Sequence, residues 1–231
     1  MKKETLSIHN IPAILWGEKM DSIYLYVHGK MSSKEDAQRF AEIAVPRGYQ
    51  VLSFDLPEHG DRKGEDYPCV VWNCVHDLEI IGKYVCENWN DICLYGCSLG
   101  AYFSLLAYKD LSIRKCLFLS PVLDMERLIR NMMKWSNVSE QELREKQRIP
   151  TPMGETLDWD YYCYAKENPV RKWSVPTAIL YGSEDNLTER EVVDGFTKRF
   201  NCDLTVMDGS EHWFHSEWQL DFLDKWIIQH M

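Results

Sequence analysis

The chain has 231 residues, 45% of them hydrophobic and 27% charged, a composition that predicts one folded domain with a sizeable core and excludes intrinsic disorder. Its formal net charge is −10 and it has no run of lysine or arginine, which argues against nucleic acid as a partner.

Neither a secretory signal nor a membrane span is indicated. The N-terminus carries two lysines but no apolar stretch behind them, and no window approaches the roughly 18 apolar residues of a spanning helix. The eight cysteines are scattered, without the CxxC pairs of a zinc site. We therefore expect a cytoplasmic protein with reduced thiols and no membrane insertion.

Eight short segments rich in β-branched and aromatic residues alternate with segments of helical period. In chain order they are 5–8, 13–16, 23–27, 51–54, 92–95, 116–119, 178–181 and 204–207. The first two are spaced as a hairpin, and the others are separated by helix-like stretches such as Ala37, Phe40, Ala41 and Ala44. This alternation predicts an α/β fold with a mostly parallel, eight-stranded sheet flanked by helices.

One region interrupts the alternation. No strand is evident between residues 122 and 175, although the strands on either side are expected to be neighbours. Asp124 and Ser139 each have the character of a helix N-cap, so we expect two helices there. The prediction is one domain over residues 1–231, with a helical cap inserted at about 122–175.

The segment Gly96-Cys97-Ser98-Leu99-Gly100 directly follows a predicted strand and directly precedes a helix-like run. G-x-S-x-G in this context is typical of a nucleophilic serine on a tight turn, whose neighbours must lack bulk. The alternative interpretation is an ordinary N-cap serine between turn glycines. We favour Ser98 as a nucleophile because the other residues that such a serine needs are also present.

A nucleophilic serine needs a base and an acid that orients the base. His212 lies in the loop after the last predicted strand, and Asp185 follows the strand before it, which gives the chain order serine, acid, histidine. The competing histidine is His215, and Asp124 is the reserve candidate for the acid. Asp185 is also suited to a turn ahead of a capped helix.

An oxyanion hole needs two backbone N–H groups close to the nucleophile. Leu99 follows the serine directly, and Lys30 follows His28-Gly29 at the end of the third predicted strand. We predict that the amides of Leu99 and Lys30 form the hole. His28 itself is interpreted as a buried structural histidine.

These residues form four ordered signatures that resemble the α/β-hydrolase superfamily over essentially the whole chain. They are His28-Gly29, Asp55-Leu56-Pro57-x-His59-Gly60, Gly96-x-Ser98-x-Gly100, and Gly182-x-x-Asp185 followed by His212. Within the superfamily the chain is similar to small bacterial carboxylesterases, the group with cinnamoyl esterases and monoacylglycerol lipases.

The sequence departs from the pattern of this group at four positions: Glu58 where glycine is usual, Lys30 and Met31 after His-Gly, and Cys97 before the nucleophile. Relatives of dienelactone hydrolase use an elbow cysteine, but here the glycines are centred on Ser98, so we interpret Cys97 as a packing residue.

The resemblance implies a serine carboxylesterase that transfers an acyl group to water through an acyl-enzyme, with no metal or organic cofactor. The expected partner is a small-molecule ester, and the sequence indicates no oligomeric state. Aromatic residues in and near the cap suit a small or medium apolar or aromatic acyl group, with Trp135, Trp159, Tyr162 and Trp213 as candidate contacts. An aminopeptidase, amidase or thioesterase on the same triad, or a silent binder of an acyl ligand, remains an alternative.

Overall fold

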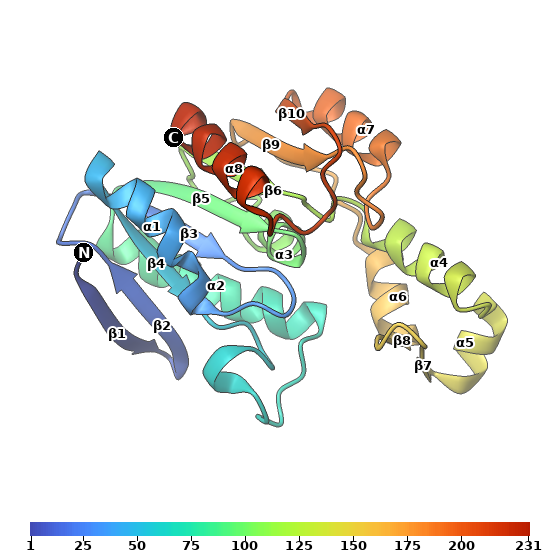
Figure 1. Ribbon diagram of the computed structural model, residues 1–231. Helices are drawn as coiled ribbons and strands as arrows, with labels where there is room; N and C mark the ends of the chain where they lie inside the picture. Colours follow the sequence, from blue (N-terminus) through green and yellow to red (C-terminus); the bar gives the residue numbers. More distant parts are fainter.

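The computed structural model describes residues 1–231 and shows a central sheet with helices on both faces (Figure 1). The sheet contains β1 (Lys3–Ile8), β2 (Ile11–Trp16), β3 (Ser22–Val27), β4 (Tyr49–Phe54), β5 (Asp91–Cys97), β6 (Lys115–Leu119), β9 (Thr177–Gly182) and β10 (Asp203–Met207). Their spatial order is β1-β2-β4-β3-β5-β6-β9-β10. Only the β1–β2 and β2–β4 pairs are antiparallel, so the predicted mostly parallel eight-stranded sheet is confirmed.

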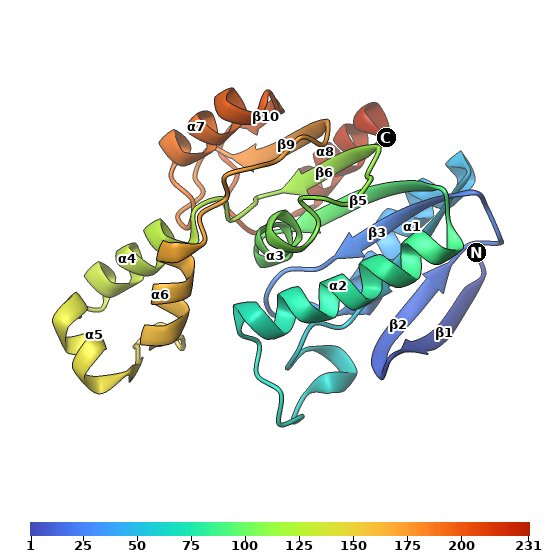
Figure 2. The same ribbon diagram turned by 180° about the vertical axis from the view of Figure 1, so that it is seen from behind.

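The inner strands of the sheet are buried on both faces because they carry apolar side chains on both. In β3, Ile23, Leu25 and Val27 join one hydrophobic cluster, whereas Tyr24 and Tyr26 join another on the opposite face. Helices α2 (Val71–Asn88), α3 (Leu99–Ala107) and α7 (Arg190–Phe200) cover the first face, and α1 (Gln38–Ala44) and α8 (Glu217–His230) cover the second. The two views in Figures 1 and 2 show these layers from opposite sides.

The strand order positions the site. From β3 the chain moves outward to β4 and then returns to the other side of β3 as β5. Connections that leave in opposite directions open a crevice at the carboxyl ends of the strands, which is where ligands bind in such sheets. The segments that follow β3, β5, β9 and β10 all emerge at this edge. Three 3-10 turns, Lys34–Ala37, Val45–Arg47 and Gly60–Arg62, complete the connections on the β3 and β4 side.

The segment between residues 122 and 175, where we predict a cap and which is called the cap below, differs from the expectation. It contains three helices, α4 (Met125–Trp135), α5 (Glu140–Lys146) and α6 (Trp159–Glu167), and a two-stranded hairpin of β7 (Arg148–Pro150) and β8 (Thr156–Asp158). The expectation of no strand was wrong because each strand has only three residues, too few for a period-2 pattern to be visible. The two predicted helix N-caps are present. The Asp124 side chain accepts from the Arg127 amide, and the Ser139 side chain accepts from the Glu142 amide.

The cap is joined to the body by a shared core and by polar contacts. The hydrophobic cluster of α2, α3 and α7 continues into cap residues such as Met133 and Tyr162. On α4, Arg127 Nε lies 3.0 Å from the Glu189 carboxylate, and Asn131 donates to the same group at 2.8 Å. At the other end of the cap Glu155 pairs with Lys30. No helix of the fold combines the length and the apolar character that crossing a bilayer requires.

Candidate active site

Ser98 occupies a strained turn between β5 and α3. Its φ of 50° and ψ of −115° lie outside the regions that non-glycine residues favour. The surrounding backbone fixes this conformation, because the Ser98 amide donates to the Leu119 carbonyl at 3.0 Å and its carbonyl accepts from the Val122 amide at 3.2 Å. The predicted strand-turn-helix context is therefore confirmed. The Ser98 side chain makes no capping bond to α3, unlike an ordinary N-cap serine.

Gly100 allows the start of α3 to pack closely against the end of β3. A Cβ atom at this position would lie 2.3 Å from the His28 carbonyl oxygen and 2.5 Å from that of Val27. Any side chain would push the start of α3 away from β3. The second glycine of the motif is thus required by packing, as the sequence pattern predicts.

A chain of hydrogen bonds joins Ser98, His212 and Asp185. Ser98 Oγ lies 2.8 Å from His212 Nε2, and His212 Nδ1 lies 2.7 Å from Asp185 Oδ2. Because an ionised carboxylate only accepts hydrogen bonds, Nδ1–H is the donor to Asp185. Nε2 is then left as the acceptor for the Ser98 hydroxyl. The arrangement is therefore able to take the hydroxyl proton when Ser98 attacks an electrophile.

Asp185 is held by the turn that follows β9. Its Oδ1 accepts from the amides of Leu187 at 2.8 Å and Thr188 at 3.0 Å, while Oδ2 faces His212. The residue is thus both the turn-forming aspartate and the carboxylate beside the histidine. The reserve candidate Asp124 lies elsewhere, where it caps α4. The competing histidine, His215, instead has its Nδ1 2.8 Å from the Trp213 carbonyl oxygen.

The two predicted oxyanion amides are both free of hydrogen bonds within the chain, and Gly29, which precedes Lys30, lies against the nucleophile, since a Cβ there would be 3.2 Å from Ser98 Cβ. Leu99 is the first residue of α3, so its amide has no acceptor within the helix, and the Lys30 amide donates no hydrogen bond within the chain. His28 Nδ1 lies 2.7 Å from the Gly29 carbonyl. Because the peptide unit is planar and trans, fixing this carbonyl also fixes the direction of the Lys30 N–H. His28 is fully buried, as expected, and the structure adds this positioning role, which the sequence did not reveal.

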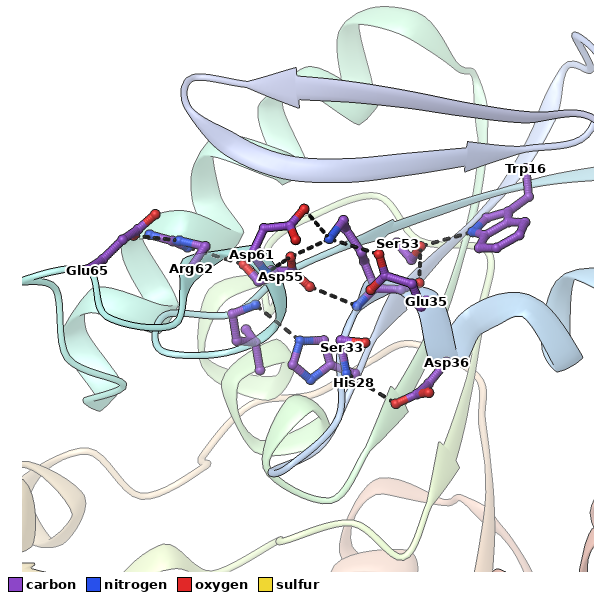
Figure 3. A network of polar contacts seen from close by, with 12 residues as sticks. Trp16, His28, Ser33, Glu35, Asp36, Ser53, Asp55, Asp61, Arg62 and Glu65 are labelled. Atoms are coloured by element: carbon purple, nitrogen blue, oxygen red, sulfur yellow. Dashed lines mark hydrogen bonds and ion pairs between the residues drawn. The ribbon is translucent and has the colours of Figure 1, made fainter.

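A buried polar network anchors the loop that carries Lys30 (Figure 3). The Lys34 amide and ammonium both donate to the Asp55 carboxylate, at 2.9 and 2.7 Å, and the Lys34 carbonyl accepts from Ser53 at 2.7 Å. Trp16 Nε1 donates in turn to Ser53 at 2.9 Å. Asp55 belongs to the second predicted signature, which therefore supports the rim of the site through Lys34.

Burial of His28 makes stability depend on pH. Desolvation lowers the pKa of His28 to about 4, whereas an unfolded histidine titrates near 6.5. As pH falls from about 6.5 to 4 the unfolded chain binds the proton first, so the free energy of unfolding is expected to fall by about 3 kcal/mol on account of this residue alone. Above pH 6.5 both states are neutral and the contribution of His28 to the pH dependence disappears.

Urea unfolding of the wild type and of His28→Gln at pH 7 and pH 4.5 tests this expectation. Glutamine is neutral at both values, so its free energy of unfolding is expected to fall by about 2 kcal/mol less than that of the wild type. Carboxylates elsewhere titrate in both proteins and cancel in the comparison. Equal decreases in the two proteins would refute the assignment to His28.

Cys97 directly precedes Ser98 in the chain, and burial raises the pKa of its thiol to about 12. A cysteine acts as a nucleophile through its thiolate, which this position disfavours. The Cys97 sulfur also lies 3.5 Å from where a Gly29 Cβ would stand. These observations fit the interpretation of Cys97 as a packing residue.

The four aromatic candidates for substrate contact occupy different environments. Tyr162 is fully buried and its hydroxyl donates to Glu140 at 3.0 Å, which places it inside the cap rather than at a surface. Trp159 packs on Tyr162. Trp135 and Trp213 are exposed, and the Trp213 ring stacks on His215.

A separate cavity of about 260 Å³ lies where the cap joins the body. Its lining includes Tyr102, Leu123, Met125, Val170, Phe196 and Phe200. None of the residues of the Ser98, His212 and Asp185 chain lines it, and neither does any of the four aromatic candidates.

Comparison with solved structures shows the same fold in esterases and lipases. Est1E from Butyrivibrio proteoclasticus, solved with ferulic acid bound, has a TM-score of 0.78 at 18% identity, over 98% of this chain and 96% of its own. The Pyrococcus furiosus esterase Pf2001 has a TM-score of 0.71 at 19% identity, over 99% and 88%. The monoacylglycerol lipase of Paleococcus ferrophilus has a TM-score of 0.68 at 17% identity, over 96% and 99%.

Comparison at the level of sequence families gives a match that covers most of the chain. The family described as the alpha/beta hydrolase family matches residues 25–224. No curated protein matches the sequence. The resemblance read from the four signatures is therefore confirmed, and the chain belongs to the alpha/beta hydrolase family.

Proposed function

We propose that the protein is a serine hydrolase that cleaves carboxylic esters through an acyl-enzyme. The observation that carries the proposal is the continuous hydrogen-bond chain from Ser98 through His212 to Asp185, built on a strained turn at the crevice edge of the sheet. A hydroxyl paired with an imidazole, itself paired with a carboxylate, is the arrangement that activates serine for acyl transfer.

The proposed reaction has two halves. Ser98 Oγ attacks the ester carbonyl while His212 Nε2 takes the hydroxyl proton, and the negative charge on the carbonyl oxygen is met by the amides of Leu99 and Lys30. The tetrahedral intermediate collapses as His212 gives its proton to the leaving alkoxide. Water then repeats these steps on the acyl-enzyme, with His212 as base, and releases the acid. Asp185 holds the imidazole in the tautomer that both halves need.

We propose that the acyl group is small or medium-sized and apolar or aromatic. The exposed rings of Trp135 and Trp213 support this class, since aromatic side chains bury large apolar area. The names of the structural neighbours agree with it: one was solved with ferulic acid, and others are an esterase and a monoacylglycerol lipase. The cytoplasm is the proposed compartment, because scattered free cysteines suit a reducing environment.

A matched set of substrates tests the leaving group. Methyl cinnamate, the N-methyl amide of cinnamic acid and a cinnamoyl thioester share one acyl group and differ only in the bond that is cleaved. The methyl ester is expected to give the highest kcat/KM, and methyl acetate a lower one. Background hydrolysis is taken from Ser98→Ala. A higher kcat/KM for the amide or the thioester would replace esterase by amidase or thioesterase on the same triad.

A further inference from the structure

Two cysteines form a contact pair at the entrance to α2. Cys74 lies in the first turns of the helix and is fully buried, whereas Cys69 lies half-buried in the coil before it. Their sulfur atoms are 3.6 Å apart, the spacing of a thiol-thiol hydrogen bond. This is the one pair among the eight cysteines joined in this way, and the proposed ester chemistry does not use it.

The two thiols have opposite character. The pKa of the Cys69 thiol is lowered, first by its hydrogen bond with Cys74 and then by the neighbouring His59. Burial and the nearby Glu58 carboxylate act in the opposite direction but do not outweigh them. Burial raises the pKa of Cys74. One sulfur is thus favoured as a thiolate while its neighbour stays a protonated thiol. A reactive thiolate with a second thiol in contact is the arrangement that turns oxidation into a disulfide.

The pair is connected to the loop of the candidate oxyanion hole. The Cys69 amide donates to the Glu58 carboxylate at 2.7 Å, and Glu58 sits in the left-handed backbone region with a φ of 62°. The next residue, His59, donates from Nδ1 to the Pro57 carbonyl and accepts the Met31 amide at Nε2, at 3.2 Å. Met31 directly follows Lys30. One short loop therefore holds Cys69 on one side and the predicted oxyanion loop on the other.

We propose that Cys69 and Cys74 are an oxidative modification site, at which hydrogen peroxide forms a disulfide that loosens the oxyanion loop and reversibly lowers hydrolase activity. Formation of the disulfide is independent of the proposed function. The effect on activity rests on that function.

The chemistry balances with peroxide as the oxidant. The Cys69 thiolate attacks one peroxide oxygen, the O–O bond breaks, and the departing hydroxide takes a proton to become water. The sulfur of Cys74 then attacks the Cys69 sulfenic acid, so that the S–S bond forms and the S–O bond breaks. The released hydroxide combines with the Cys74 proton. In sum, two thiols and one peroxide give one disulfide and two waters.

Bond formation has to move Cys69. A disulfide bond is about 2.05 Å long, so the two sulfurs must approach by about 1.5 Å. Cys74 is fixed because its amide donates to the Val70 carbonyl at 3.0 Å in the helix. The displacement therefore falls on the coil that carries Cys69, whose amide is bonded to Glu58. Loss of the hydrogen bond from the Cys69 amide to Glu58 loosens the loop in which the next residue, His59, accepts the Met31 amide.

Peptide mapping tests the disulfide without any assay of activity. Both cysteines lie in the single tryptic peptide Gly64–Lys83. After mild hydrogen peroxide treatment of the native protein, this peptide is expected to lose two hydrogens, to resist iodoacetamide, and to accept it again at both cysteines after dithiothreitol. Cys69→Ser and Cys74→Ser are expected to give no such peptide. Cys86 is the matched control: it is exposed, but its thiol pKa is raised, so it is expected to react more slowly than Cys69.

The same samples give the effect on ester turnover. The wild type and Cys86→Ser are expected to lose activity several-fold with peroxide and to regain it with dithiothreitol, whereas Cys69→Ser is expected to keep its own untreated activity. Recovery with dithiothreitol excludes sulfoxide formation at the exposed Met31, which dithiothreitol does not reverse.

Each failure has a distinct meaning. Free thiols or uncrosslinked oxidation products at Cys69 and Cys74 would overturn the modification site. A disulfide that leaves turnover unchanged would overturn the link to the oxyanion loop. Absence of ester turnover before any oxidation would overturn the proposed function, while the peptide map would still decide the disulfide.

Discussion

Replacing Ser98 by alanine is expected to lower kcat for a p-nitrophenyl ester by about 10⁴- to 10⁶-fold, the range for removal of the nucleophile from such a triad. Alanine keeps Cβ and removes only Oγ, so the imidazole loses the hydroxyl that lies 2.8 Å from it. The backbone at φ 50° is held by hydrogen bonds that the substitution leaves in place. The thermal midpoint is therefore expected to stay close to that of the wild type. Steady-state kinetics and a thermal melt on the same preparation check both expectations.

Cys97→Ala is the control for this experiment, because it removes the neighbouring thiol from the same turn. Its thiol is half-buried and has a raised pKa, so the variant is expected to retain most of the wild-type kcat. A Cys97→Ala protein without activity beside an active Ser98→Ala protein would move the nucleophile to Cys97. Activity of Ser98→Ala near that of the wild type would reject the acyl-enzyme mechanism at Ser98.

Asp185→Asn is expected to lower kcat by about 10²- to 10⁴-fold, as loss of the carboxylate favours the wrong histidine tautomer. The asparagine amide can donate to His212 Nδ1, which would place the imidazole proton on Nε2, opposite Ser98. The base would then have no free lone pair for the hydroxyl proton. His212→Ala is expected to cost at least as much. Measurement of kcat for the three single variants at Asp185, His212 and Ser98 checks this order.

Asp124→Asn is the matched control for the acid. Asparagine still offers an oxygen to the Arg127 amide, so the N-cap of α4 is preserved, and the carboxylate bonded to His212 is that of Asp185, not Asp124. Activity close to that of the wild type is expected. Equal losses in Asp124→Asn and Asp185→Asn would show that the wrong acid has been assigned.

Much of the architecture follows from local sequence patterns. The inner strands of the main sheet are read from short apolar runs, because in a strand covered on both faces nearly every residue is buried. The position of Ser98 follows from its glycines, and Gly100 shows why, since a Cβ there would collide with β3. His212 and Asp185 follow from their places after the last two strands. In each case the signal lies within a few residues of the site.

The features that the sequence did not reveal depend on contacts between distant segments. Lys34 and Asp55 form a buried pair across 21 residues, and nothing near Lys34 distinguishes it from a surface lysine. The role of His28 in fixing the Gly29 carbonyl is visible only in three dimensions. In the cap, α6 is not predicted from the sequence because its aromatic run does not form a clean apolar stripe. The contact between Cys69 and Cys74 is likewise visible only in three dimensions, where their sulfurs lie 3.6 Å apart.

Labelling of the native protein with an active-site fluorophosphonate, followed by peptide mapping, tests most directly whether Ser98 is the activated nucleophile. A phosphonylated serine forms only where a hydroxyl is activated by a base and its oxyanion is stabilised. We expect one adduct, on Ser98, with loss of ester turnover in proportion to labelling and no adduct in Ser98→Ala. Labelling of His212→Ala is expected to be much slower. An adduct on another residue, or a folded wild-type protein that resists the probe, would contradict the assignment of Ser98 as the nucleophile.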